Sequence, residues 1–268
     1  MSDPKLEGLP RLIDDRKIFP KGESPRLELD VEIGYRHLVR AVINPDERKA
    51  EILKENPNFD PHQVEVTYWK EVRPLYDQGT RLLNKTFFYE YLNLVRAEGL
   101  DHINLAIFDL DFLKAYNGLF GEPKAGDLAI AATVDSLTAA EKALANPSGG
   151  ILTVRLDGDT FAVIFSEARL QTGAASDFIN RFPELLGQRQ LELGEGTEKF
   201  RGLTSTDQEQ LRQYLVNPKI SSSGLETISL KKDNREVGDQ LGIITQKIEK
   251  IKKEKRPKEI ADLVKRLG

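Results

Sequence analysis

ILTVRLDGDTFAVIF, residues 151–165, is the stretch that decides the fold expected for this chain. Two apolar runs flank the dipeptide Asp157-Gly158, and both are rich in β-branched and aromatic residues. Such runs around an Asp-Gly pair are typical of two antiparallel strands joined by a tight turn with positive φ. The segment therefore predicts a buried β-hairpin that carries Asp159 at its apex.

Upstream of this hairpin, the pattern predicts a helix, a strand and a second helix. Asn84 is placed to cap a helix that Gly99 ends, and residues 103–108 form an apolar run that finishes at Asp109-Leu110-Asp111. Apolar residues then recur at helical spacing from Asp127 to Leu144. The expected order is helix, strand, helix, hairpin.

This order of elements predicts that two carboxylates form a candidate metal site. Asp109 ends a buried strand and Asp159 sits at a hairpin apex, so the two can converge. Magnesium is held through one or two carboxylates plus substrate phosphates, and paired ions polarise the attacking and leaving oxygens of an in-line displacement. Taken singly, each aspartate is also what an ordinary strand end or turn carries.

The segment before the first predicted helix is expected to form a small helical module. Residues 30–76 show apolar side chains on one helical face and a break near Asn56-Pro57, whereas residues 1–30 show no sustained periodicity. Pro74 should prevent a continuous helix from running into the segment that follows.

The segment after the hairpin is expected to be mostly helical with one strand. A capping-box pattern joins Thr206 to Glu209, and residues 220–223 read as a short strand. A closing helix is predicted from about Val237 to Lys255, with an isoleucine stripe, and a short helix after Pro257.

The composition excludes several classes of protein. The 268 residues include no cysteine, which rules out disulfides and thiolate-held metals. His37, His62 and His102 lack metal-ligand spacing and are expected to be structural. No apolar run approaches the roughly 20 residues that cross a bilayer, and no signal peptide opens the chain, so a cytoplasmic location without a membrane is expected.

The charge distribution favours no nucleic-acid partner. Residues 246–268 carry nine Lys/Arg against four Asp/Glu, and the remainder is net negative. A basic run of this kind is most often the solvated face of a helix, and no basic stripe with interleaved aromatics accompanies it. We predict no binding to nucleic acid.

Four segments, in order, resemble motifs of the GGDEF family of diguanylate cyclases. Residues 77–85, DQGTRLLNK, resemble D-x-L-T-G-L-x-N-R, and residues 109–117, DLDFLKAYN, resemble D-x-D-x-F-K-x-x-N. Residues 121–127, GEPKAGD, are similar to G-H-x-x-G-D with one extra residue and Glu for His. Residues 155–162, RLDGDTFA, correspond to the signature R-x-G-G-[DE]-E-F-A.

The resemblance implies an α/β palm fold of the nucleotide-cyclase and polymerase type. Its sheet would be mixed, mainly antiparallel and flanked by helices, with an N-terminal helical extension. Residues 1–76 would be the extension and helical module, residues 77–256 the GGDEF-like domain, and residues 257–268 a short C-terminal helix.

The resemblance also implies a site for GTP, or another guanine nucleotide, with Mg²⁺ or Mn²⁺. Asp109 and Asp159 would be catalytic and, together with the carbonyl of Leu110, would hold the metal. Asn117 and Asp127 would read the guanine edge, because an amide and a carboxylate match its acceptor and its donors. The full set of implied nucleotide-binding residues is Lys114, Asn117, Asp127, Arg155, Gly158, Lys252 and Arg256.

The signature loop departs from the family at two positions. Thr160 replaces a glutamate and removes a carboxylate from the site, while Asp157 replaces a glycine and adds a charge. Two charges 4 Å apart interact by about 1 kcal/mol in water and about 4 kcal/mol at an effective dielectric near 20, so Asp157 is expected to weaken triphosphate binding.

Three interpretations remain open on the sequence. The chain is a degenerate GGDEF domain that binds guanine nucleotide and signals with weak or no cyclase activity, or an active cyclase that condenses two GTP into cyclic di-GMP as a homodimer. The third is a related palm nucleotidyltransferase, such as a CRISPR-type oligoadenylate polymerase, that makes another oligonucleotide. In each of them, a protein partner is expected to bind through residues 1–76.

Overall fold

The protein is described here by a computed structural model that covers residues 30–110, 124–144, 150–166, 170–216, 220–231 and 234–254. Three predicted nucleotide-binding residues, Lys114, Asn117 and Arg256, lie outside the described residues. So do the segment 1–29 and the short helix expected after Pro257.

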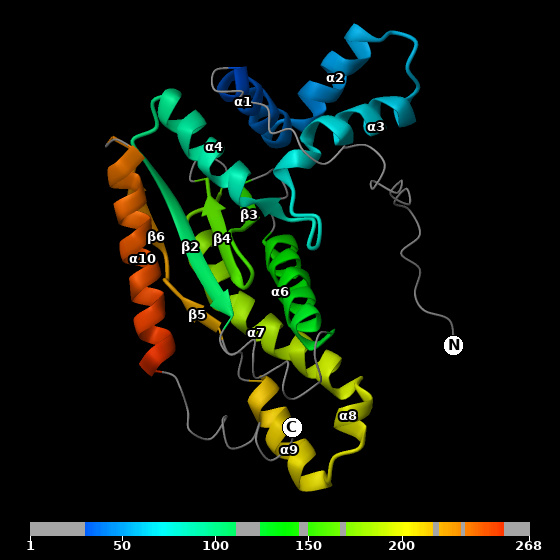
Figure 1. The fold of residues 1–268 in the computed structure, drawn as a ribbon, viewed down its shortest axis with the longest axis vertical. Helices are drawn as coiled ribbons and strands as arrows, with labels where there is room; N and C mark the ends of the chain where they lie inside the picture. Colours follow the sequence, from blue (N-terminus) through cyan, green and yellow to red (C-terminus); the bar gives the residue numbers. More distant parts are fainter. Residues whose placement is uncertain are drawn as a thin grey trace, which may run out of the picture.

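Within the described residues, six strands form one mixed sheet in the order β1-β3-β4-β2-β5, and β6 also pairs with β2 (Figure 1). β1 runs parallel to β3, and every other pairing is antiparallel. The strands are β1 (Leu83–Asn84), β2 (His102–Leu110), β3 (Ile151–Arg155), β4 (Thr160–Phe165), β5 (Ile220–Ser222) and β6 (Glu226–Ser229). The expected fold class, a mainly antiparallel sheet flanked by helices, is confirmed.

Helices cover both faces of the sheet. α4 and α10 lie on one face, and α6 and α7 lie on the other (Figure 1). The described helices are α1 (Asp30–Ile43), α2 (Pro45–Glu55), α3 (Pro61–Val72), α4 (Lys85–Ala97), α6 (Lys124–Ala143), α7 (Ala174–Glu195), α8 (Glu198–Arg201), α9 (Ser205–Val216) and α10 (Asn234–Glu254), with a 3₁₀ turn, η2 (Arg73–Leu75).

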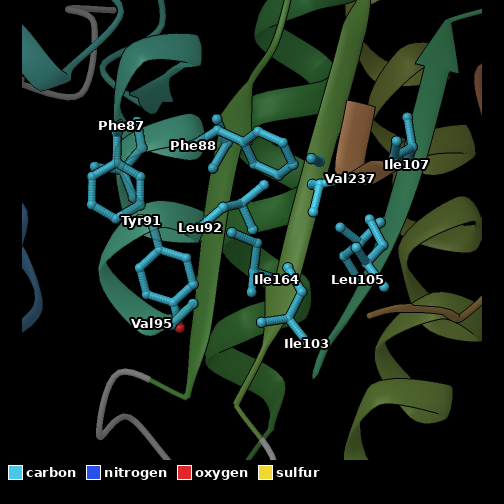
Figure 2. Close-up of a cluster of buried hydrophobic side chains, with 14 of the residues drawn as sticks. Phe87, Phe88, Tyr91, Leu92, Val95, Ile103, Leu105, Ile107, Ile164 and Val237 are labelled. Carbon is cyan, nitrogen blue, oxygen red and sulfur yellow. The ribbon is translucent and has the colours of Figure 1, made fainter. Parts of the chain in front are cut away.

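The central strand β2 is buried on both faces, which explains its continuous apolar sequence. Leu105 and Ile107 join the cluster under α4 and α10 that Figure 2 shows, whereas Ala106 and Phe108 join the cluster under α6 and α7. Successive side chains of a strand point to opposite faces, so the next residue, Asp109, faces α10.

Helix α4 forms as its sequence predicts. The Asn84 side chain accepts a hydrogen bond from the Phe87 backbone N–H at 3.0 Å, and Gly99 ends the turn with φ of +84°. Phe87 and Tyr91 lie on the buried face of α4 (Figure 2). The predicted cap, inward face and stop are all confirmed.

The predicted hairpin is confirmed, but its turn differs from the one expected. The β3–β4 ladder ends at the pair Arg155–Phe161, and Leu156 N donates to Thr160 O at 2.9 Å. Neither Asp157 nor Gly158 has positive φ. The expectation of a tight positive-φ turn is wrong, because the longer loop distributes the reversal over more residues and no residue needs the left-handed region.

Two short strands and one helix start escaped the sequence analysis. β1 and β6 are too short to show a period, and the cap of α9 lies two residues before the predicted one. Thr204, and not Thr206, caps α9 by accepting from Asp207 N at 3.2 Å. Two overlapping Thr-x-x-acid patterns occur here, and local spacing cannot choose between them.

The N-terminal module packs on the rest of the molecule. The α1 side chain Val39 is fully buried in the cluster formed by α4, the sheet and α10. α3 ends at Val72, and η2 follows with Pro74 inside it, so the expected interruption is confirmed. None of the helices in the described ranges is long and apolar enough to cross a bilayer.

Candidate functional site

Asp109 lies near the end of β2, between two neighbouring strands. Asp109 pairs with Thr160 on β4 on one side and with Ser221 on β5 on the other. The next residue, Leu110, donates its backbone N–H to the carbonyl of Asp159 at 3.0 Å. The fold therefore places Asp109 and Asp159, far apart in the chain, side by side at one end of the sheet, as the sequence led us to expect.

The alternation of side chains explains what surrounds Asp109. On β4, Ala162 and Ile164 face the α10 side, and Thr160 continues that row. Thr160 Oγ1 donates to Asp109 Oδ2 at 3.1 Å. The hydroxyl that replaces the family's glutamate is thus directly bonded to the predicted metal ligand.

Helix α10 supplies the other contact of Asp109. Ile244, Ile248 and Lys252 are spaced by four and share one helix face, of which the two isoleucines are buried. The same face directs the Lys252 ammonium to Asp109 Oδ1, with which it forms an ion pair. The phosphate contact of Lys252 stays a prediction. The isoleucine spacing places Lys252 on the buried face of the helix, but it could not identify Asp109 as the partner.

The environment of Asp109 shifts its ionisation. Burial raises the pKa of Asp109 to about 6, and the nearby charge of Asp159 acts in the same direction, while bonds from Lys252 and Thr160 act against it. A carboxylate with this pKa, beside a second carboxylate, is a place where a bound cation would be stabilised.

The signature loop is held by a second network. Arg155 Nη1 pairs with Asp77 Oδ1 at 3.0 Å, and Arg155 Nη2 donates to Gly158 O at 2.8 Å. Asp77 Oδ1 also accepts from Thr80 N at 2.8 Å and from Thr80 Oγ1 at 2.7 Å. Burial opposes ionisation, but these bonds hold the pKa of Asp77 below its ordinary value. The network attaches the loop to the turn that precedes β1.

The second altered position, Asp157, is engaged within the loop. Its Oδ1 accepts from the Gly158 backbone N–H at 2.8 Å. Because the amide dipole partly compensates the negative charge of this carboxylate, Asp157 should repel a phosphate less than the Coulomb energy of two unpaired charges would give.

The remaining predicted residues are placed as follows. Asp127 is exposed in the first turn of α6, and Gly158 is exposed in the β3–β4 loop. Arg155 is engaged by Asp77 and Gly158, as given above. The nucleotide-binding and catalytic roles of all these residues stay predictions.

The donor set decides which metal chemistry the site fits. Among the described residues there is no group of three His, Cys, Asp or Glu side chains that could hold a metal ion. Mg²⁺ needs only one or two carboxylates when substrate phosphates supply other oxygens. Asp109 and Asp159 therefore fit a magnesium ion that arrives with a nucleotide better than one held by protein alone.

Comparisons with known proteins bear on the family. Residues 74–200 match the family model for "Diguanylate cyclase, GGDEF domain". The GGDEF domain of FimX from Pseudomonas aeruginosa is 13% identical at a TM-score of 0.44, over 67% of this chain and 94% of its own. The diguanylate cyclase SiaD from the same organism, in complex with its activator SiaC, is 15% identical at a TM-score of 0.43, over 82% of this chain and 78% of its own.

A sensory box/GGDEF family protein from Caulobacter crescentus is 27% identical at a TM-score of 0.33, over 42% of this chain and 70% of its own. No curated protein sequence matches the chain. The sequence match over the segment that carries β2, the hairpin and their connecting helix decides the assignment: residues 74–200 of this chain belong to the GGDEF domain family.

Proposed function

We propose that the site around Asp109 binds a guanine nucleotide, GTP with Mg²⁺ or Mn²⁺, and that the chain acts in cyclic di-GMP signalling with weak or no cyclase activity. In this proposal Asp109, Asp159 and the Leu110 carbonyl hold the metal. The metal would polarise the phosphates, and the protein would position them.

The observation that carries the proposal is the bond between Thr160 and Asp109. A neutral hydroxyl lies 3.1 Å from Asp109 Oδ2, at the position where the family signature has a carboxylate. Phosphoryl transfer depends on preorganised charge around the metal and the leaving group, and the loss of one such group typically costs about 10²–10³ in kcat. Binding needs fewer of these groups than catalysis, so binding is expected to survive.

An active cyclase is the second candidate, and one observation favours it. Asp109 and Asp159 are both present and adjacent, and Asp157 directs its carboxylate to the loop's own amide. Two carboxylates suffice for magnesium with a triphosphate. In this case the enzyme would act as a homodimer that joins two GTP molecules.

Calorimetry tests the site and its metal together. We expect GTP with Mg²⁺ to bind the wild type and the Asp239→Asn variant, which removes an exposed carboxylate of α10, and to bind Asp109→Asn at least about tenfold more weakly. Absence of heat in the wild type would overturn nucleotide binding. Tighter binding of ATP than of GTP would overturn the guanine assignment and favour the oligoadenylate alternative.

Product analysis separates the two candidate functions. Purified protein is incubated with GTP and Mg²⁺ or Mn²⁺, and cyclic di-GMP is measured by mass spectrometry. We expect little or none. Sustained turnover, with a dimer seen by light scattering in the presence of GTP, would establish the active cyclase instead.

A further inference from the structure

The fold directs the Lys252 ammonium toward Asp109 and away from solvent. It follows Ile248, which is buried, by one helical turn, and its side chain is 22% exposed against 12% for Asp109. The nearby Lys247 is 53% exposed and pairs with Glu226 on β6. The two lysines lie on the same helix, but only Lys252 reaches the predicted metal ligand.

Both oxygens of Asp109 are occupied by the protein's own groups. Oδ2 accepts from Thr160 Oγ1, and Oδ1 pairs with the Lys252 ammonium. Since the pair is mostly buried, salt screens it less than a surface pair. A divalent cation that binds Oδ1 must therefore displace a positive charge that is already there.

We propose that Lys252 is the resident counter-ion of Asp109, which keeps divalent metal out of the free site and leaves it only when nucleotide phosphates attract the ammonium. The first half concerns the free protein alone, and the second half rests on the proposed nucleotide site. Metal and nucleotide would then each strengthen the binding of the other, as linkage requires.

The test is Mn²⁺ binding to the nucleotide-free chain, measured from the electron paramagnetic resonance signal of unbound Mn²⁺. We expect Lys252→Met to bind Mn²⁺ at least about tenfold more tightly than the wild type, because the competing charge is gone. Lys253→Met is the matched control: it removes the adjacent, exposed lysine and should behave as the wild type. Lys252→Arg keeps the charge and should also leave Mn²⁺ binding weak.

A double variant identifies the site. Adding Asp109→Asn to Lys252→Met should abolish the gain, which shows that the new affinity belongs to Asp109. An equal gain in Lys253→Met, or no gain in Lys252→Met with an unchanged circular dichroism spectrum, would overturn the proposal. If the Met variant does not fold, Lys252→Gln, which keeps a polar group of similar length, is judged by the same two outcomes.

The two proposals fail in different ways. Failure of the wild type to bind GTP would overturn the proposed function and leave the Mn²⁺ comparison intact. If GTP binds but its affinity is the same with and without Mn²⁺, the linkage between nucleotide and metal is overturned even where Lys252→Met gains Mn²⁺.

Discussion

The Thr160 hydroxyl gives Asp109 one hydrogen bond but no charge. A glutamate at this position would add a second anionic neighbour and a further oxygen for a hard cation. At the scale of single residues, our proposal attributes to this difference the expected binding of nucleotide with weak or no turnover.

Thr160→Glu is therefore expected to raise cyclic di-GMP production by about tenfold or more, because a preorganised charge is restored to the metal site. Production from GTP and Mg²⁺ is measured by mass spectrometry beside Thr160→Gln, which has nearly the same size and no charge. A similar rise in both variants, or in neither, would show that the carboxylate is not what the site lacks.

The ionisation of Asp109 should appear in the stability of the chain. Its pKa is raised from 3.8 to about 6, so the folded chain binds this proton more tightly than the unfolded chain. The stabilisation that this group contributes is fully present below pH 3.8 and is lost as the pH rises to about 6. At 1.36 kcal/mol per pKa unit, the free energy of unfolding falls by at most about 3 kcal/mol.

Urea unfolding across this pH window checks the expectation. Asp109→Asn cannot ionise, so its stability relative to the wild type should increase as the pH rises. A constant difference between the two proteins would mean that Asp109 keeps an ordinary pKa in the folded state.

At the scale of elements, the hairpin and the turn before β1 are joined by one arginine. The Arg155 side chain is 18% exposed and its partner Asp77 is 29% exposed, and Arg155 also binds the loop carbonyl of Gly158. We expect this network to maintain the shape of the loop that carries Asp159.

Arg155→Ala should lower the free energy of unfolding by about 2 kcal/mol, because a part-buried carboxylate loses a charged hydrogen-bond donor. Arg189→Ala is the comparison: it removes a pair with Asp135 in which both side chains are more exposed, 41% and 52%, and should cost under about 1 kcal/mol. Urea denaturation of both variants measures the difference. Equal costs would contradict the role given to Arg155.

At the scale of the whole molecule, the N-terminal module and the GGDEF domain share a core. Val39 of α1 is fully buried beside residues of α4 and the sheet. The chain's single tryptophan, Trp69, lies on α3 and reports on the module, whereas circular dichroism reports on the whole chain.

We expect the two signals to change together during urea unfolding, since a shared core couples the two parts. Val39→Ala should lower the free energy of unfolding by about 2 kcal/mol, and by the same amount in both signals. Leu53 is 45% exposed, so Leu53→Ala should change the free energy of unfolding by no more than about 0.5 kcal/mol in either signal. Separate transitions would show that the module folds as its own unit.

Local patterns were enough to predict much of this fold. The cap at Asn84, the apolar run of β2 and the paired runs of β3 and β4 each depend on residues close in sequence, and each is confirmed. The cap of α9 at Thr204 and the strand β6 were not predicted, because overlapping capping patterns and very short strands cannot be resolved from local spacing.

The sequence by itself determined the order of the elements, the family and the two aspartates at one end of the sheet, since these follow from period, spacing and motif. Only the tertiary structure decided that Lys252 and Thr160 occupy the two oxygens of Asp109. The physical reason is that the partners of a buried charge are set by which helix face packs on which strand face, and that pairing joins residues far apart in the chain.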